Sequence, residues 1–184
     1  MTIELIYTGV LQGLILAVIA FGIMIPFRFL NFPDLTAEGA YPMGGAVCAS
    51  LIIAGTPQIL AMVIGATAGG LLAVCTSQVA LRLKVNSLLA GIILSTMAYS
   101  INLRIMGKPN IALFEISGIS FNLINLVIII IVCITAFTLF LHTDFGLRFR
   151  TIGSNSNFAV NYGISANKYT SLGLFIAGSM FGLA

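Results

Sequence analysis

Charged side chains are scarce in this chain. Only 7% of its 184 residues are Asp, Glu, Lys or Arg, while 59% are hydrophobic and the mean hydropathy is +1.12. Soluble domains carry about 25% charged residues, so this chain has too few charges to cover a soluble surface. We therefore expect an all-α, polytopic membrane helix bundle in which residues 1–184 form a single transmembrane domain.

The patterns of metal, cofactor and catalytic sites are also missing. Cys48, Cys75 and Cys133 lie far apart without CxxC or Cys/His spacing, and His142 is the only histidine. The chain contains no GxxxxGK[ST] phosphate loop, no nucleophile–base constellation and no basic patch suited to nucleic acid. We expect no cofactor, no metal, no nucleic-acid partner and no enzymatic activity.

Six apolar runs approach the length of about 20 residues that a spanning helix needs. They cover Ile6–Phe27, Leu35–Ala54, Pro57–Leu81, Leu88–Leu103, Phe121–Leu141 and Tyr169 onward. The sixth run stops at Ala184 without a flanking charge. We therefore expect the last span to be incomplete and the domain to be C-terminally truncated.

The basic residues are distributed unequally between the two sides that alternating connections define. Six lie on one side and two, Arg104 and Lys108, on the other. The six are Arg28, Arg82, Lys84, Arg148, Arg150 and Lys168. The positive-inside rule makes the six-residue side cytoplasmic and places the N-terminus outside, with an external loop over residues 107–120.

Small residues recur four positions apart. These pairs are Gly9/Gly13, Gly65/Gly69, Ala66/Gly70 and Gly178/Gly182. Such spacing lets helix backbones approach closely within a bundle or across a dimer. The glycine richness common in membrane helices is an alternative explanation.

The segment after the first run interrupts the apolar pattern with prolines and two carboxylates, Asp34 and Glu38. One interpretation is a capped helix start. Asp34 would bind the free N–H groups, and Glu38 would lie one turn into the helix, where a negative charge interacts favourably with the helix dipole. The other is a broken helix beside a translocation path, since charge at membrane depth is expensive and usually functional. In the second interpretation Asn31 and Thr36 also contribute to the path.

The fourth run carries hydroxyl and amide side chains. Ser95, Tyr99 and Asn102 follow helical spacing on one face. They are candidates for the same translocation path, and hydrogen bonding between helices would explain them equally well.

A polar, basic connection, Phe145–Ile164, separates the fifth and sixth runs. A short helix over Phe158–Tyr162, capped by Ser156 or Asn157, is plausible within it. Its apolar side chains suit the groove of a soluble partner, or alternatively the lipid headgroup surface.

Three segments carry a resemblance to a known family. The stretches FRFLNFPDLTAEGAYPMGGA (27–46), NSLLAGIILSTMAYSINLRIMGKPNI (86–111) and GLRFRTIGSNSNFAVNYGIS (146–165) occur in order along the chain. Together they resemble permeases of binding-protein-dependent ABC importers, in the branched-chain amino acid and ribose permease superfamily. Within it the chain is most similar to the uncharacterised tryptophan- and tyrosine-type subgroup.

The resemblance implies a permease subunit of the bacterial inner membrane that carries a small solute, an aromatic or branched-chain amino acid. The permease would pair as a homodimer or with a related permease, bind a separate cytoplasmic ABC ATPase and receive substrate from a periplasmic binding protein. Residues 142–168 would form the coupling loop. Its contacts to the ATPase would come from Arg148, Arg150, Gly153, Asn157, Phe158, Ala159, Tyr162 and Gly163.

Two other classes stay open on the residues alone. A secondary transporter or channel without an ATPase would use intramembrane carboxylates, for which Asp34 and Glu38 are the candidates. A non-functional permease fragment is the third possibility.

Overall fold

The computed structural model describes residues 2–109, 123–154, 159, 161–163 and 165–184. The first helix, α1 (Thr2–Met24), continues directly into a π-helical turn, η1 (Ile25–Phe29). The others are α2 (Ala37–Ile53), α3 (Gln58–Leu83), α4 (Ser87–Met106), α5 (Leu123–Leu141), α6 (Asp144–Ser154) and α8 (Ala166–Leu183). The described residues contain helices and no strand, which confirms the all-α prediction.

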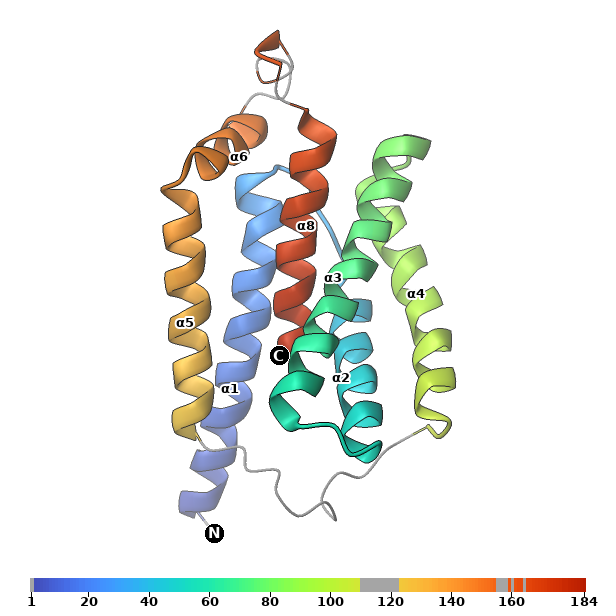
Figure 1. Cartoon of the computed structure of the whole chain (residues 1–184), viewed down its shortest axis with the longest axis vertical. Helices are drawn as coiled ribbons and strands as arrows, with labels where there is room; N and C mark the ends of the chain where they lie inside the picture. The colour runs from blue at the N-terminus through green and yellow to red at the C-terminus, as the bar shows by residue number, and fades with distance from the viewer. Residues whose placement is uncertain (1, 110–122, 155–158, 160, 164) are drawn as a thin grey trace.

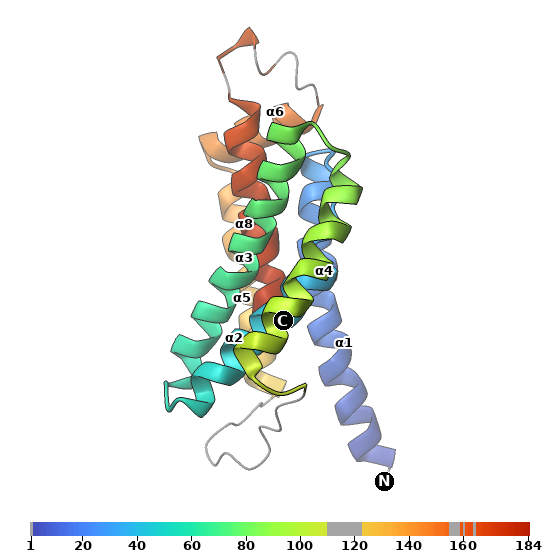
Figure 2. The same ribbon diagram turned by 90° about the vertical axis from the view of Figure 1, so that its right-hand side faces the viewer.

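The long helices run side by side along the long axis of the molecule, as Figures 1 and 2 show. α1, α3 and α5 end at the same end of the bundle, where α4 and α8 begin and α6 lies across. α2 differs, because it begins part-way down the bundle (Figure 1). The six basic residues that were predicted to share a side belong to this one end.

The helices α2, α3 and α8 meet through glycines. A Cβ added at Gly178 would lie 2.6 Å from the carbonyl oxygen of Gly69, and one at Gly69 would lie 2.5 Å from that of Gly178. A Cβ at Gly182 would lie 2.7 Å from the Gly65 oxygen, and one at Gly44 only 2.3 Å from Gly182 Cα. Real Cβ atoms do not approach other atoms this closely. Larger residues at these positions would therefore push the three backbones apart.

Only some of the predicted small-residue pairs have this role. Gly65/Gly69 and Gly178/Gly182 pack against each other within the chain, and Gly70 lies against Ser179. Gly9 and Gly13 have no neighbouring atom within 4 Å of a built Cβ. The pattern predicted close approach correctly in α3 and α8, and sequence alone did not distinguish the open pair in α1.

A second contact region joins α1, η1, α5 and α6 through aromatic rings. Phe137 of α5 makes edge contacts with Phe21 and Phe29, at centroid distances of 5.4 and 5.6 Å. Phe140 of α5 then contacts Phe149 of α6 edge-on at 6.0 Å. This geometry is the favourable one for aromatic pairs, and it fixes α6 against the end of the bundle.

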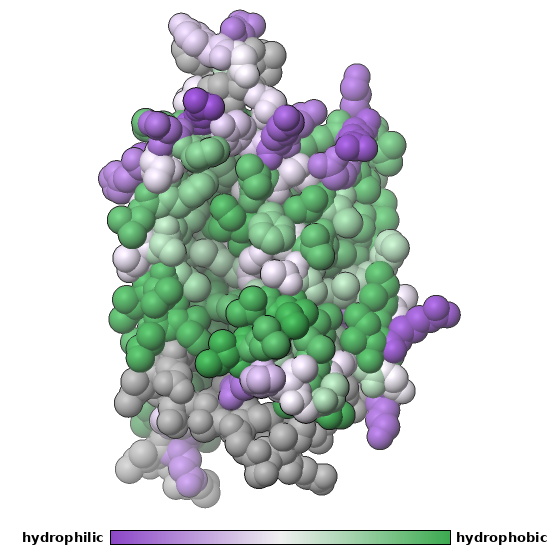
Figure 3. Space-filling view, viewed as in Figure 1, coloured by the Kyte–Doolittle hydropathy of each residue, from purple (hydrophilic) through white to green (hydrophobic). Residues whose placement is uncertain are grey.

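Within the described part of the chain, three helices are long and apolar enough to span a membrane: Glu4–Phe29, Gln58–Leu83 and Ser87–Met106. A fourth span is possible from the pair Val127–Leu141 and Asp144–Ser154, which bends by 80°. Figure 3 shows hydrophobic side chains filling the middle of the visible face, with hydrophilic ones gathered mainly at one end. Large apolar side chains such as Ile59, 79% exposed, point outward, as lipid contact requires.

Most of the predicted runs correspond to helices with small shifts at their ends. The predicted Leu88–Leu103 is extended to Ser87–Met106, and the run from Tyr169 begins earlier, at Ala166. The weakest run, Leu35–Ala54, is a helix of 17 residues. The external loop predicted for residues 107–120 lies largely outside the described residues.

We expect Gly178→Val to lower the free energy of unfolding by about 1–3 kcal/mol, because a side chain forced into packed backbone strains the core. Thermal unfolding of the purified protein in mild detergent measures the effect. Gly45→Val is the matched control, since Gly45 is a helical glycine with no atom within 4 Å of a built Cβ. Equal losses in both variants would contradict the close α3–α8 approach.

Candidate functional site

The connection between η1 and α2 is the most irregular part of the described backbone. The N–H of Phe32 donates to the carbonyl of Pro26 at 2.9 Å, a wider turn than an α-helix allows. Asn31 then has a φ of +49°, a left-handed conformation that Asn tolerates better than most residues. Pro26 within η1 and the left-handed Asn31 together end the first helix and direct residues 30–36 back into the bundle.

Asp34 is buried and bound to Thr36. One carboxylate oxygen, Oδ1, accepts from the backbone N–H of Thr36 at 2.9 Å and also contacts the Thr36 hydroxyl. Asp34 is 3% exposed and Thr36 is completely buried. The other oxygen, Oδ2, is buried without a hydrogen-bond partner in the described part of the chain.

The interpretation of Asp34 as a cap holds only in part, since Asp34 accepts from a backbone N–H at this turn but is not the N-cap residue of α2. α2 begins at Ala37 with Thr36 at the N-cap position, and no side chain caps it by a hydrogen bond. The Asp34 carboxylate instead binds the N-cap residue itself, because the chain turns once more after Asp34. Glu38 lies in the first turn of α2, as predicted.

A chain of hydroxyl groups connects Asp34 to α3. The Thr36 hydroxyl lies 2.9 Å from the hydroxyl of Thr76, which in turn lies 3.2 Å from the carbonyl of Leu72. Each hydroxyl has a single proton to donate. Thr36 can therefore donate to Asp34 while Thr76 donates to Thr36. If Thr36 instead donates to Thr76, and Thr76 to Leu72, the contact between Thr36 and Asp34 requires a proton on the carboxyl group.

These contacts also fix the depth of Asp34 in the bundle. Thr76 precedes the end of α3 at Leu83 by seven residues, which is about 10 Å of helix rise. On the facing helix α4, the Ser95 hydroxyl donates to the carbonyl of Leu35 at 3.3 Å, eight residues, or about 12 Å, beyond the start at Ser87. The segment around Asp34 thus lies well inside the ends of both helices rather than at the surface of the bundle.

α4 packs directly on this segment because it carries a glycine there. A Cβ added at Gly91 would lie 3.0 Å from the Leu35 nitrogen and 3.1 Å from Asp34 Oδ1. Further along α4, Asn102 is 3% exposed. With its amide oriented to satisfy both groups, it donates to the Ala98 carbonyl at 3.2 Å and accepts from the Met43 N–H at 3.3 Å.

The predicted path residues therefore divide into two groups. Asp34, Thr36, Ser95 and Asn102 meet along the contact between α4 and the beginning of α2. Asn31, Glu38 and Tyr99 are exposed, and Tyr99 is exposed over 65% of its surface. Thr76 and Gly91 were not predicted, since a threonine or glycine within a long apolar helix has no distinguishing pattern.

The polar connection after α5 is largely an amphipathic helix, which sequence reasoning missed. α6 begins at Asp144, turned 80° from α5, and buries Gly146, Phe149 and Ile152. Arg148 and Arg150, both expected to contact an ATPase, lie exposed on it. The Arg148 guanidinium donates to the Tyr169 hydroxyl at 3.3 Å, which raises the pKa of Arg148.

Gly153 is a packing position at the end of α6. A Cβ there would lie 1.9 Å from the carbonyl oxygen of Phe29, so α6 touches the end of η1 with its backbone. On the same helix Phe149, 1% exposed, fills the space over Gly173 of α8. A displacement of α6 must therefore move both η1 and α8.

The remaining coupling residues lie beyond α6. Ala159 is fully buried, Tyr162 is 72% exposed, and Gly163 has a φ of +76° that disfavours any side chain. Asn157 and Phe158 lie outside the described residues, whereas Ala159 and Asn161, which belong to the predicted short helix, are helical. Among the described residues, no group of three His, Cys, Asp or Glu side chains is placed to hold a metal ion.

Comparison with known proteins gives a family for this arrangement. Residues 5–184 match the family described as "Branched-chain amino acid transport system / permease component". The chain belongs to this permease family. The family and the long apolar helices support a membrane protein, in agreement with the resemblance seen in its sequence.

Two relatives of the permease are similar along nearly its whole length. It is 33% identical over 178 residues to a protein named "Tyrosine transport system permease protein" from Clostridioides difficile, covering 94% of this chain and 60% of the relative. It is 32% identical over 186 residues to "Uncharacterized protein RP368" from Rickettsia prowazekii, covering 98% of this chain and 66% of the relative. The chain thus spans about two thirds or less of the relatives' length. No solved structure matches it.

We expect Thr36→Val to lower the free energy of unfolding of the permease by about 1.5–3 kcal/mol, as loss of a hydrogen bond to a charged group does. The substitution keeps the shape of the side chain but removes the hydroxyl between Asp34 and Thr76. Thr67→Val is the matched control, because the exposed Thr67 hydroxyl bonds only the carbonyl of Ile64 in its own helix. A similar loss in both variants, measured by thermal unfolding, would show that the buried network does not stabilise the fold.

Proposed function

We propose that this chain forms the membrane-spanning permease part of a binding-protein-dependent ABC importer for an amino acid. The family match over residues 5–184 carries this proposal. The relative named as a tyrosine transport permease supports an amino acid as the solute. Since the chain has no phosphate-binding loop, ATP hydrolysis would take place in a separate cytoplasmic ATPase.

The polar residues between α2 and α4 are the proposed lining of the translocation path. Asp34, Thr36, Ser95 and Asn102 place carboxylate, hydroxyl and amide groups inside an apolar bundle. Irregular backbone such as residues 30–36 is tolerated at membrane depth where it is buried in protein or lines a cavity. The exposed Asn31, Glu38 and Tyr99 would then face the paired permease or the path that both subunits share.

Positive charge supports a cytoplasmic position for the α6 end of the bundle. Arg28, Arg82, Lys84, Arg148, Arg150 and Lys168 belong to this end, against Arg104 and Lys108 at the other. An ATPase docked there on α6 and on residues 159–163 would displace α6 during its cycle. The contacts of Phe149 with Gly173 and of Gly153 with Phe29 would transmit this movement to α8 and to the first helix. η1 leads directly into the segment that carries Asp34.

One observation favours a second candidate function. A buried carboxylate with an unpartnered oxygen, as in Asp34, is also the kind of residue that ion-coupled secondary transporters use. The two functions differ in their energy source, and transport assays separate them.

We expect uptake of labelled tyrosine or leucine into proteoliposomes to require the binding protein, the ATPase and ATP together. The proteoliposomes contain the permease together with a candidate ABC ATPase and a candidate binding protein from the same organism. Uptake that continues with a hydrolysis-deficient ATPase and follows an imposed proton gradient would support the secondary transporter instead.

Arg150→Glu should weaken co-purification of the ATPase and reduce uptake in the same proportion, because it reverses an exposed charge on the proposed docking helix. Arg104→Glu is the control, as the same charge reversal at the opposite end of the bundle. Membrane insertion should be normal in both. If Arg150→Glu binds its ATPase normally, or if Arg104→Glu loses it equally, docking on α6 is disproved.

A further inference from the structure

Asp34 is the one acidic side chain that the described part of the chain buries. It is 3% exposed, whereas Glu4, Glu38 and Asp144 are exposed. In an apolar interior a carboxylate ion is stable only where a cation pairs with it or where hydrogen-bond donors replace its water, and otherwise it takes up a proton. The charge state of Asp34 therefore follows from the groups that surround it.

No cation of this chain pairs with Asp34. All eight Lys and Arg side chains belong to the described residues, and all are exposed. On the elements around Asp34 they include Arg28 in η1, Arg82 in α3 and Arg104 in α4. Neither these nor the other titratable side chains of the same elements form a hydrogen bond or an ion pair with Asp34. The others are Glu38, Tyr41, Cys48, Cys75, Lys84 and Tyr99. The negative charge of an ionised Asp34 would therefore be unpaired.

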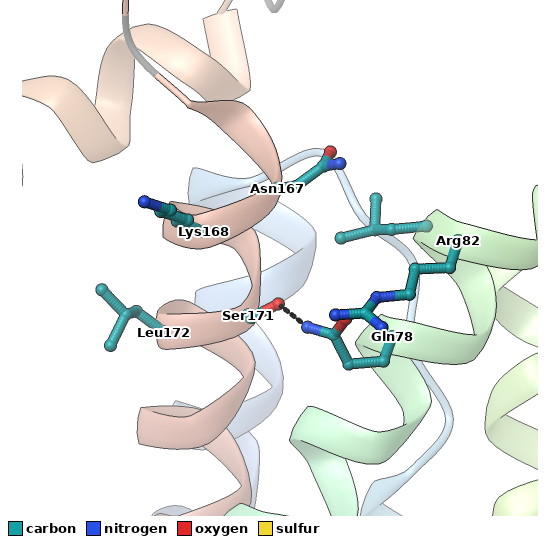
Figure 4. A pocket seen from close by; sticks show the side chains of 7 residues that line it. Gln78, Arg82, Asn167, Lys168, Ser171 and Leu172 are labelled. Carbon is teal, nitrogen blue, oxygen red and sulfur yellow. Dashed lines mark hydrogen bonds between the residues drawn. The ribbon is translucent and has the colours of Figure 1, made fainter.

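Arg82 lies on α3, the helix that carries Thr76, but its side chain is in a different region. Figure 4 shows it in a groove between α3 and α8 that Gln78 and Ser171 also line. There the Gln78 amide donates to the Ser171 hydroxyl at 3.0 Å. The polar groups on the α8 side of α3 thus have partners and an open groove beside them, whereas Asp34 is enclosed by protein.

The hydrogen bonds around Asp34 also favour a neutral carboxyl group. The two groups of Thr36 that reach it, the N–H at 2.9 Å and the hydroxyl, both contact the same oxygen, Oδ1. Oδ2 is buried and has no donor among the described residues. An ion would thus keep one of its charged oxygens without a partner, while a neutral acid leaves only an uncharged carbonyl oxygen unbonded.

A proton on Oδ1 also completes the chain of hydroxyl groups. Asp34 then donates to the Thr36 hydroxyl, Thr36 donates to Thr76 at 2.9 Å, and Thr76 donates to the Leu72 carbonyl at 3.2 Å. Each hydroxyl has one proton to donate, and this arrangement uses all of them in one direction, from Asp34 toward α3.

We propose that Asp34 binds a proton in this conformation, and that the neutral carboxyl group holds residues 30–36 against α3 and α4. The packing around the group is close, since a Cβ added at Gly91 of α4 would lie 3.1 Å from Oδ1. When the proton leaves to water, the carboxylate needs a donor or a cation that its enclosed position lacks, so the segment must move to expose it. Asp34 is then a switch that couples ionisation to opening of the connection between η1 and α2, whichever energy source drives transport.

The test of the bound proton is infrared spectroscopy of the purified protein in lipid vesicles at neutral pH, with aspartate labelled by ¹³C at the side-chain carboxyl group. The chain contains two aspartates, Asp34 and Asp144. We expect the C=O stretching band of a protonated carboxyl group, shifted to lower frequency by the label, in the parent and in Asp144→Asn, where Asp34 is the only aspartate left. Asp34→Asn should lack this band. Its absence from Asp144→Asn would overturn the proposal, even if Asp34→Asn fails to fold.

Hydrogen exchange, measured by mass spectrometry, tests the switch. Peptides covering residues 30–40 are compared between the parent and Asp34→Asn, which has the size of the protonated acid and cannot ionise. The ratio of the two exchange rates should rise from neutral to alkaline pH, by up to about tenfold per pH unit, because each opening of the parent releases one proton. Peptides from residues 58–66 of α3 are the internal control and should keep a constant ratio.

A constant ratio over residues 30–40 as well would show that the proton does not hold the segment. In Asp144→Asn, faster exchange of the same peptides and loss of the infrared band should have the same midpoint pH. Separate midpoints would likewise overturn the switch.

Discussion

Between α3 and α8 the two backbones are in contact, and the positions of the other elements follow from that contact. Gly69 and Gly178 bring their carbonyl oxygens to within reach of the opposite helix, and Gly44 and Gly182 add α2 to the same contact. In lipid the hydrophobic effect does not drive helices together, so they associate through close van der Waals packing. The small residues make that packing possible, and they set how near α2 comes to α3 and α4.

The position of α2 explains how a carboxylate can be kept within an apolar bundle. Because α2 begins inside the bundle, the preceding residues 30–36 must bring their polar backbone groups there as well. Thr36, Thr76 and Ser95 supply hydrogen bonds from three elements, and Gly91 leaves the space that the segment occupies. Most polar groups of this network have hydrogen-bond partners, which favours a single conformation of the segment. Asp34 Oδ2 has no partner among the described residues, so it can still gain a proton or a new hydrogen bond.

Hydrophobic length predicted the helices, and glycine spacing predicted that some helices approach closely, since both patterns depend on residues close together in sequence. That α3 meets α8 was not predicted, because Gly69 and Gly178 are far apart in the chain. The family too was recognisable from short stretches around residues 27–46, 86–111 and 146–165. α6 was not predicted, because its four-residue apolar spacing is interrupted by arginines and its burial depends on Gly173, far along the chain. The depth of Asp34 depends on its distant partners Thr76 and Ser95, and no local pattern reveals such a contact. The roles of the proposed path and coupling residues stay predictions.

The glycine contact also has a consequence for the synthesis of the protein. Gly69 and Gly178 are 109 positions apart in the chain. At about 5–20 residues per second, α3 waits about 5–20 s in the translocation machinery or the bilayer before its partner is made. During that interval the glycine face of α3 is not covered by α8 and can contact other helices. Until α8 is made, the bundle therefore lacks the contact that holds α3 in place.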